Sequence, residues 1–146
     1  MNKKPTTSGI IIILKNKEVL ICHPTNSKWH LTFSFPKGII NEDETSIEAA
    51  IRETKEEIGI EIDKDLLHDY IPIIFETRYK IHHLYKLYID DISQIGLEQE
   101  IIPVNQLQTE EVDWAGFVSF GEAKNRLHMK YNSIINKLIE NQTIDR

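Results

Sequence analysis

Cysteine and long apolar segments are scarce in this sequence. Its 146 residues include one cysteine, Cys22, which excludes an internal disulfide and is typical of a reducing compartment. Cys22 lies in the apolar run VLICH, so we expect a packed small side chain rather than a nucleophile. No segment reaches the length needed to span a bilayer, and the polar residues 1–8 are unlike a signal peptide. The sequence therefore predicts a cytoplasmic protein without a membrane partner.

Positively charged residues are also fewer than negatively charged ones. The 17 lysines and arginines are outnumbered by 23 aspartates and glutamates, which gives a formal net charge of -6. This balance argues against a broad, sequence-independent nucleic-acid surface, because such a surface needs a basic footprint. A small anionic substrate stays compatible with it, since bound metal ions and a few local cations can set the field at a site. The length suits one domain over residues 1–146, and nothing in the sequence indicates an oligomeric state.

The pattern of apolar residues predicts strands in the first part of the chain. A flexible lead over residues 1–8 precedes two strands, 9–14 and 18–22. The first strand is expected to be buried on both faces, because its isoleucines are continuous. A further short strand near 32–35 is expected to end at Pro36.

The second half of the chain mixes strands and helices. The runs IPIIFETRYK and IHHLYKLYID predict an antiparallel hairpin, and EVDWAGFVSF predicts the last strand. Ser119 and Glu122 have the spacing of a capping box, which predicts a helical segment over about 119–141. This order of elements favours helices packed against a mixed sheet.

The most informative stretch is residues 38–60, GIINEDETSIEAAIRETKEEIGI, in which Gly38 begins a loop that leads into a helix. Thr45 and Glu48 form a capping box at the start of this helix. Gly59 stands where a helix commonly ends in a left-handed turn. One face of the helix carries an apolar stripe, made of Ile47, Ala50, Ile51, Thr54 and Ile58.

The opposite face of the same helix carries three carboxylates. Glu53, Glu56 and Glu57 are three or four residues apart and therefore point the same way. Like charges at this spacing cost roughly 0.2–0.5 kcal/mol per pair, and they stand toward the negative end of the helix dipole. A solvated acidic face is the ordinary interpretation of such a cluster. A hard divalent cation such as Mg2+ would relieve the repulsion, because such ions take oxygen ligands.

A longer sequence motif favours metal binding by these glutamates over the interpretation as a solvated acidic face. Gly38, five residues, Glu44, seven residues and then RETKEEIGI (Arg52–Ile60) resemble the Nudix box, with every fixed glycine, glutamate and arginine at its spacing. Thr54 is a mild departure, because the family usually has an aliphatic residue there. The resemblance implies an α/β fold, the Nudix α/β/α sandwich with a mixed central sheet. It also implies that residues 38–60 form a loop–helix–loop catalytic box.

The resemblance further implies a reaction and a cofactor. Nudix enzymes hydrolyse a pyrophosphate bond in a nucleoside diphosphate linked to another group, and they use Mg2+ or Mn2+. Arg52 matches the arginine that orients the box glutamates, and Glu44 belongs to its supporting network. The metal ligands that the resemblance implies are Glu53, Glu56, Glu57 and the carbonyl oxygen of Gly38.

The general base is not decided by the sequence, because Nudix enzymes differ on this point. Glu53 is one candidate. The others are loop carboxylates, each of which, taken singly, is more often a solvated side chain. They are Glu98, Glu100, Glu110 and Glu111.

The expected substrate rests on two short runs. FPKG (Phe35–Gly38) resembles the box entrance of asymmetric diadenosine tetraphosphate hydrolases, and RETKEE (Arg52–Glu57) resembles the same group. We therefore expect a dinucleoside polyphosphate such as diadenosine tetraphosphate, with Lys37 reaching a phosphate as a point charge. Aromatic side chains stack on bases, although strand tyrosines more often pack in the core. The residues expected to contact the base are Tyr79, Tyr85 and Tyr88, and His83 beside them is expected to contact the substrate.

Three other functions stay open. A nucleoside triphosphate pyrophosphatase that removes damaged nucleotides would release pyrophosphate and a monophosphate. An RNA 5′-end pyrophosphohydrolase fits the acidic balance less well. A catalytically silent, nucleotide-sensing Nudix domain would usually lack box glutamates, and this chain keeps all three.

Overall fold

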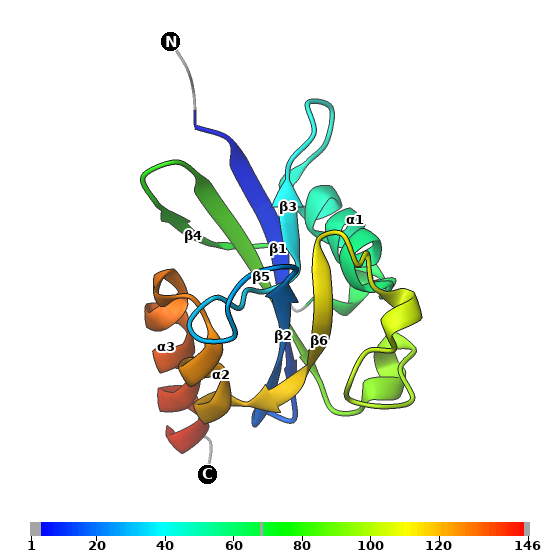
Figure 1. Cartoon of the computed structure of the whole chain (residues 1–146), viewed down its shortest axis with the longest axis vertical. Coiled ribbons are helices and arrows are strands. Elements are labelled where there is room, and N and C mark those ends of the chain that lie inside the picture. The colour runs from blue at the N-terminus through cyan, green and yellow to red at the C-terminus, as the bar shows by residue number, and fades with distance from the viewer. Residues whose placement is uncertain (1–3, 68, 145–146) are drawn as a thin grey trace.

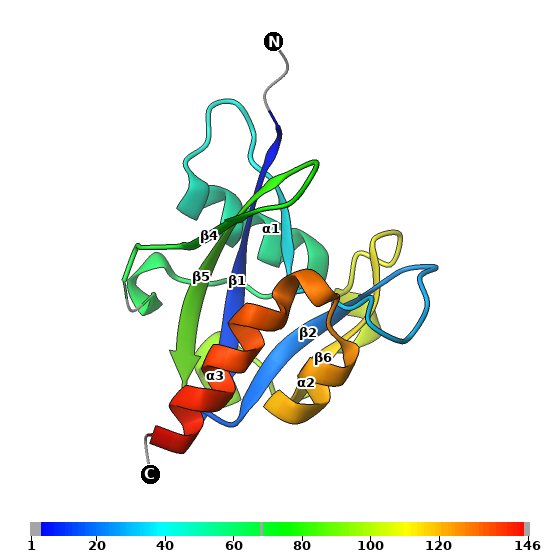
Figure 2. The ribbon, with the colours of Figure 1, turned by 90° about the vertical axis from the view of Figure 1, so that its left-hand side faces the viewer.

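A mixed β-sheet lies between two helical layers. The computed structural model describes residues 4–67 and 69–144. Helix α1 (Ser46–Ile58) covers one face of the sheet, while α2 (Phe120–Arg126) and α3 (Asn132–Ile144) cover the other (Figure 1, Figure 2). The α/β sandwich with a mixed sheet, expected from the resemblance, is confirmed. Among the described residues, no helix has the length and apolar character needed to cross a membrane.

The sheet has the order β4-β5-β1-β2-β6, and β3 pairs with β1 off this path. Its strands are β1 (Thr6–Leu14), β2 (Glu18–Pro24), β3 (Lys37–Ile39), β4 (Ile73–Glu76), β5 (Ile81–Ile89) and β6 (Val112–Ser119). β1 and β5 pair in parallel along the full length of β1, whereas the other pairs are antiparallel. The hairpin and the last strand that the sequence predicts are therefore present as β4–β5 and β6.

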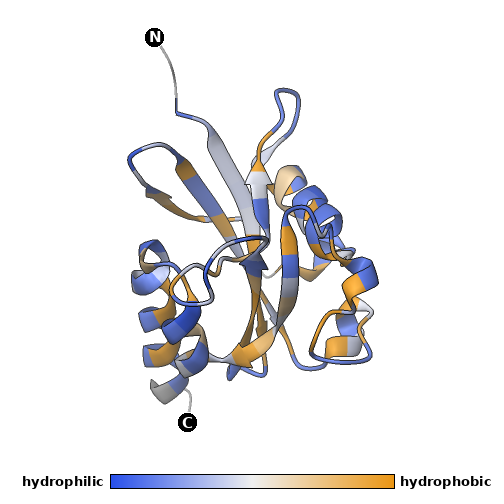
Figure 3. Ribbon diagram, in the orientation of Figure 1, coloured by the Kyte–Doolittle hydropathy of each residue, from blue (hydrophilic) through white to orange (hydrophobic). Residues whose placement is uncertain are grey.

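Strand β1 is buried on both faces, as its continuous isoleucines predict. Ile10 and Ile12 pack into the core under α1, and Ile11 and Ile13 pack into the core under α2 and α3. Successive side chains of a strand point to opposite faces, so this one strand contributes to both cores. Figure 3 shows the matching pattern on the helices, where hydrophilic and hydrophobic positions alternate along α1 and α3.

The first strand begins earlier than the sequence suggests. Residues 1–3 of the predicted lead lie outside the described part of the chain, but Thr6 already pairs in β1. Thr7 and Ser8 are buried, so the prediction of a flexible lead is wrong for these residues. Polar residues such as these do not indicate a buried strand in a sequence. They are accommodated in one here because each side chain has a hydrogen-bond partner inside the protein.

The strand expected near 32–35 is also displaced. Only isolated bridges form at Phe33 and Ser34, and the regular strand β3 follows Pro36 instead of ending at it. Gly9 allows this arrangement, because a Cβ there would lie 2.2 Å from the carbonyl oxygen of Pro36. The backbone of β3 therefore lies directly against β1, and Gly38 is part of a strand rather than the start of a loop.

Helix α1 has the boundaries that its capping residues predict. The Thr45 side chain accepts a hydrogen bond from Glu48 N, and the Glu48 carboxylate accepts one from Thr45 N. Gly59 ends the helix in the left-handed region, with φ of 69°. Thr54 is buried, and its hydroxyl donates to the carbonyl oxygen of Ala50 over 2.8 Å. Threonine is therefore accommodated at a position where the family pattern has an aliphatic side chain.

The helical segment predicted over 119–141 is broken in two. Ser119 caps α2 by accepting a hydrogen bond from Glu122 N, as expected. The helix then stops at Arg126, because the backbone of Phe33 bonds to both sides of the break: its N–H donates to Arg126 O, and its carbonyl accepts from His128 N. A short 3-10 turn, Met129–Tyr131, leads from there into α3.

Candidate active site

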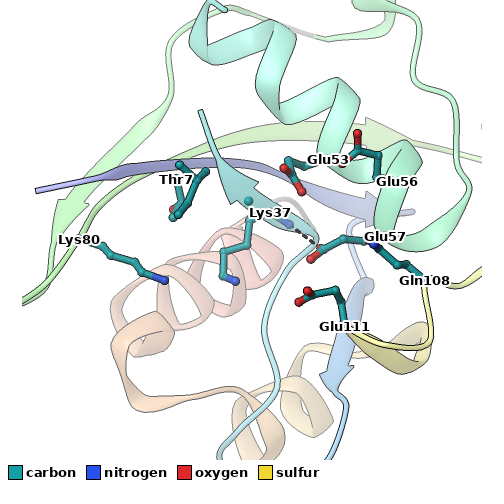
Figure 4. A pocket seen from close by; sticks show the side chains of 10 residues that line it. Thr7, Lys37, Glu53, Glu56, Glu57, Lys80, Gln108 and Glu111 are labelled. Atoms are coloured by element: carbon teal, nitrogen blue, oxygen red, sulfur yellow. Dashed lines mark hydrogen bonds between the residues drawn. The ribbon is translucent and has the colours of Figure 1, made fainter. Parts of the chain in front are cut away.

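One pocket brings together all of the predicted metal ligands, with Lys37 and one of the loop carboxylates. It encloses about 400 Å³. Figure 4 shows Glu53, Glu57 and Glu111 on one side of this pocket and Lys37 and Lys80 on the other. Its full lining is Thr7, Lys37, Gly38, Ile39, Glu53, Glu56, Glu57, Lys80, Gln108 and Glu111. Carboxylates and ammonium groups therefore face each other across a single cavity.

Arg52 joins the carboxylates of the box into one network. Its Nε and Nη2 atoms donate to both oxygens of Glu44 over 2.6 and 2.9 Å. Its Nη1 atom donates to Glu53 over 2.8 Å and to Glu56 over 3.0 Å. A planar guanidinium group is suited to such simultaneous contacts. The hydrogen bond from Arg52 is the main reason why the pKa of the Glu44 carboxyl lies below its usual range.

The contact between β3 and α1 requires a glycine at residue 38. A Cβ on Gly38 would lie 2.0 to 2.4 Å from the carboxyl atoms of Glu53. Any side chain at residue 38 would therefore occupy the place of this carboxylate. The same closeness brings the backbone of Gly38 and the Glu53 carboxylate together in the pocket lining.

Glu57 is the most desolvated carboxylate of the box. Its Oε1 atom accepts a hydrogen bond of 2.9 Å from Lys37 N, drawn as a dashed line in Figure 4. Burial raises the pKa of Glu57 to about 7, and the nearby charges of Glu53 and Glu111 act in the same direction. The hydrogen bond and charge of Lys37 oppose this rise. A group with such a pKa is sensitive to any cation that enters the pocket.

The loop before β6 contributes one of the four loop carboxylates to the pocket. Gln108 N donates to the carbonyl oxygen of Glu57, which holds this loop against the end of α1. Glu111 N in turn donates to the carbonyl oxygen of Gln108, and the Glu111 carboxylate lines the cavity. Glu53 lines it as well, whereas the three other candidates for the general base, Glu98, Glu100 and Glu110, are not in the lining.

The residues expected to contact the base are dispersed. Tyr85 is 4% exposed within the core under α1, which leaves no free ring face for stacking. Tyr79 is 70% exposed but does not line the pocket, and Tyr88 is also exposed outside it. The His83 ring bonds to the hydroxyl of Ser46 over 2.8 Å. Of the substrate contacts that the sequence suggests, only Lys37 lies in the pocket.

The structure adds four lining residues that sequence reasoning did not assign to the site, of which Ile39 is the neighbour of Gly38 in β3. Lys80 lies in the turn between β4 and β5, and Gln108 lies in the loop before β6. Thr7 comes from β1, where its hydroxyl is 2.8 Å from Nδ1 of the buried His82. No local pattern marks Thr7, Lys80 or Gln108. Thr7 and Lys80 reach the pocket through the pairing of β1 with β3 and β5, and Gln108 reaches it through its backbone hydrogen bond to Glu57.

The family model of the NUDIX domain matches residues 3–140 of the chain. The chain belongs to the Nudix family. The m7GpppN-mRNA hydrolase of Saccharomyces cerevisiae is 30% identical over 125 residues, or 84% of this chain. That match covers 12% of the yeast protein, so the chain spans only a small part of the length of this curated relative.

Solved structures of Nudix proteins have the same fold. A NUDIX hydrolase from Nitrosomonas europaea superposes with a TM-score of 0.69 at 16% identity, covering 96% of this chain and 73% of that one. An Ap4A hydrolase from C. elegans superposes with a TM-score of 0.63 at 22% identity, covering 92% of this chain and 96% of that one. The family expected from residues 38–60 is thereby confirmed.

Nudix hydrolases generally use divalent metal ions, and the donors in this pocket suit a hard cation. Carboxylate oxygens of Glu53, Glu56 and Glu57 and the backbone of Gly38 share the lining. Within residues 4–67 and 69–144, however, no three acidic, histidine or cysteine side chains are already arranged around a common point. Arg52 instead holds Glu53 and Glu56. The donor chemistry therefore fits, because Arg52 binds only Oε1 of Glu53 and Oε2 of Glu56, and the second oxygen of each carboxylate can bind a cation when the side chains move together.

We expect Gly38→Ala to weaken divalent-metal binding without unfolding the protein. The new methyl group displaces the end of the Glu53 side chain, which moves more easily than backbone. Calorimetric titration with Mn2+ should show affinity at least about tenfold lower, with a melting temperature within a few degrees of wild type. Gly121→Ala is the matched control, because a Cβ there meets no atom within 4 Å. Unchanged Mn2+ affinity in the Gly38 variant would contradict this account of the site.

The metal-free Nudix protein should reveal the raised pKa of Glu57 in its stability. Between about pH 4.5 and 7 the folded chain retains a proton on Glu57 that the unfolded chain, with its ordinary pKa of 4.5, releases. The destabilisation by Glu57 therefore grows as pH rises from about 4.5 to about 7 and is fully present above that. In urea titrations with EDTA, Glu57→Gln should be more stable than wild type at pH 7.5, by about 2–3 kcal/mol.

This advantage of the Glu57→Gln variant should shrink as pH falls below 7 and vanish by about pH 4, where Glu57 is protonated in the folded and in the unfolded chain. His82 gives stability the opposite dependence on pH, and comparing wild type with the Glu57→Gln variant cancels this contribution. Burial lowers the pKa of His82 to about 4, which destabilises both proteins equally as pH falls below 6.5. A stability difference that does not vary with pH would show that Glu57 is not desolvated.

Proposed function

We propose that this Nudix protein hydrolyses a pyrophosphate bond in a nucleoside diphosphate linked to another group. The substrate class that we favour is the dinucleoside polyphosphates, of which diadenosine tetraphosphate is an example, and the cofactor is Mg2+, with Mn2+ able to replace it. One observation carries the proposal: a single pocket combines the box carboxylates with Lys37 and Lys80. A cytoplasmic location stays a prediction from the sequence.

The chemistry follows from the negative charge of the polyphosphate. Oxygens on a polyphosphate repel an attacking water, so the site must neutralise charge and hold that water in line. When bound, Mg2+ supplies positive charge at the phosphate oxygens and lowers the pKa of a coordinated water. The Arg52 guanidinium keeps Glu53 and Glu56 facing the pocket, and Lys37 meets a phosphate oxygen.

Glu111 is our candidate for the general base. It is the one loop carboxylate of the four considered that lines the pocket, and Arg52 does not bind it, in contrast to Glu53. Glu111 takes a proton from the water as the water oxygen bonds to phosphorus. The phosphoanhydride bond breaks in the same displacement, and the leaving phosphate departs with its electron pair. Glu53 keeps an orienting role in this scheme.

The yeast relative supports the choice of substrate class. Its name states that it acts on m7GpppN-mRNA, in which two nucleosides are joined through three phosphates. Chemically, this linkage is a dinucleoside triphosphate, so the same kind of bond is presented by a small dinucleotide and by a capped RNA end. The formal charge of -6 favours the small molecule for this chain, because long RNA would need a basic track.

The test is hydrolysis of diadenosine tetraphosphate with Mg2+, with products separated by chromatography. We expect ATP and AMP in equal amounts. Glu57→Gln should lower kcat/KM by on the order of 100-fold or more, because it removes a charged ligand. Glu61→Gln is the control, since Glu61 is an exposed glutamate that pairs only with Lys55 in the structure. Equal losses in the two variants would contradict the assignment of the site.

The alternatives give different products in the same assay. Pyrophosphate released from canonical or oxidised nucleoside triphosphates identifies a cleansing pyrophosphatase. Release of capped or 5′-terminal nucleotides from RNA, without turnover of diadenosine tetraphosphate, identifies an RNA-directed enzyme. Nucleotide binding without turnover of any substrate identifies a sensing domain.

Glu111→Gln should separate the general base from the metal ligands. We expect kcat to fall by about 100-fold or more with KM little changed, and Mn2+ affinity should stay close to that of wild type. Loss of Mn2+ affinity in this variant would assign Glu111 to the metal instead. Unchanged kcat would return the role of base to Glu53.

A further inference from the structure

The side of the pocket opposite the box carboxylates is basic, and nothing in the Nudix box accounts for it. Lys37 from β3 and Lys80 from the β4–β5 turn both line the cavity, and Figure 4 shows their side chains lying near each other. Thr77 holds this turn in shape, because its N–H and its hydroxyl both donate to the carbonyl oxygen of Lys80. Lys80 is therefore presented by a closed turn.

A third lysine reaches the same region from the other end of the chain. The ring of Tyr131 packs 5.0 Å from Phe35, two residues before Lys37, and 6.0 Å from Phe75 in β4. Lys130 precedes this tyrosine, and its Nζ atom lies 5.3 Å from the centre of the tyrosine ring. The short turn before α3 thus brings Lys130 toward β3, which carries Lys37, and β4, which precedes the turn with Lys80, at the edge of the pocket rather than in its lining.

The three ammonium groups act on one another. Burial lowers the pKa of Lys130, and the charges of Lys37 and Lys80 lower it further. The same three lysines lower the pKa of His82, which lies beneath this side of the pocket. Among the described residues, none of the three lysines forms an ion pair with a carboxylate. Lys37 also attracts the Glu57 carboxylate, but no electrostatic partner of opposite charge is found among the described residues for Lys80 and Lys130, although the chain has a net charge of -6.

We propose that Lys80 and Lys130, together with Lys37, form a subsite for the phosphate groups that lie beyond the cleaved bond. This inference rests on the proposed function and makes it more specific. Half-buried cations without a partner are stabilised by an anion with several charges, and a polyphosphate chain provides one. The pocket then holds the cleaved bond at the carboxylate side and the rest of the polyphosphate at the lysine side.

The subsite has a consequence for substrate choice. A substrate with three or more phosphates in a row reaches the lysines, whereas a nucleoside diphosphate sugar places an uncharged sugar there. The lysines therefore favour dinucleoside polyphosphates over nucleoside diphosphate sugars. Thr7 also lines this pocket, and its hydroxyl is hydrogen-bonded to the buried ring of His82.

The first test measures binding without a metal or a reaction. Inorganic tripolyphosphate is titrated calorimetrically into the full chain in EDTA at low salt. We expect binding by wild type, and affinity lower by about tenfold in each of Lys80→Gln and Lys130→Gln. Lys80→Arg should retain most of the affinity, because it keeps the charge. Lys124→Gln serves as a control for total charge, since Lys124 is an exposed residue of α2 outside the pocket.

The second test measures kcat/KM for diadenosine tetraphosphate and for a nucleoside diphosphate sugar. Lys80→Gln and Lys130→Gln should lower the value for the tetraphosphate by about tenfold each and lower the value for the sugar compound by less than about threefold. The effect should lie mainly in KM. Equal losses for both substrates, or losses as large in Lys124→Gln, would overturn the subsite while leaving the hydrolase proposal intact.

The two tests separate this inference from the proposed function. Tripolyphosphate binding that depends on Lys80 and Lys130, in a protein that hydrolyses no dinucleoside polyphosphate, supports the subsite and contradicts the proposed reaction. Hydrolysis of diadenosine tetraphosphate by a protein that does not bind tripolyphosphate supports the proposed reaction and contradicts the subsite. Equal tripolyphosphate affinity in wild type and both lysine variants also overturns the subsite.

Discussion

The active site depends on the pairing of one guanidinium group with three carboxylates. Glu53 and Glu56 stand on the same face of α1 as Glu57, and their charges repel one another at this spacing. Arg52 offsets the repulsion by binding Glu53, Glu56 and the loop residue Glu44 at once. The arginine is thus both an electrostatic and a geometric requirement, since it fixes where the carboxylates point before any cation arrives.

The strand that supports this network is β1. Its isoleucines are buried in both cores, so it is among the best-packed elements of the fold. On one side it binds β3, which carries Lys37 and Gly38, and on the other it binds β5, whose preceding turn carries Lys80. The close approach at Gly9 makes the first of these contacts possible. A rigid strand between these two neighbours holds Lys37 and Lys80 at a constant separation.

Prediction from the sequence succeeded where a feature is local. The capping box of Thr45 and Glu48 determines where α1 begins, and the helical spacing of the glutamates determines that they share a face. It failed where a distant segment intervenes. The helix expected over 119–141 is interrupted because Phe33 pairs with the backbone on both sides of Leu127. The prediction that Tyr85 contacts the substrate failed for the same reason. Its position in β5, which pairs in parallel with β1, directs its side chain into the core.

The amino-acid sequence by itself determined the family, the helix α1 and the carboxylates that α1 brings to the pocket, because all of these lie within 23 consecutive residues, 38–60, whose geometry is mainly that of one helix and its caps. Only the tertiary structure decided that Glu111 rather than Glu98 or Glu100 reaches the cavity, and that the opposite side is basic. Lys37, Lys80 and Lys130 are far apart in the chain. No periodicity relates them, and they meet only because β1, β4, β5 and the turn before α3 pack around shared apolar side chains.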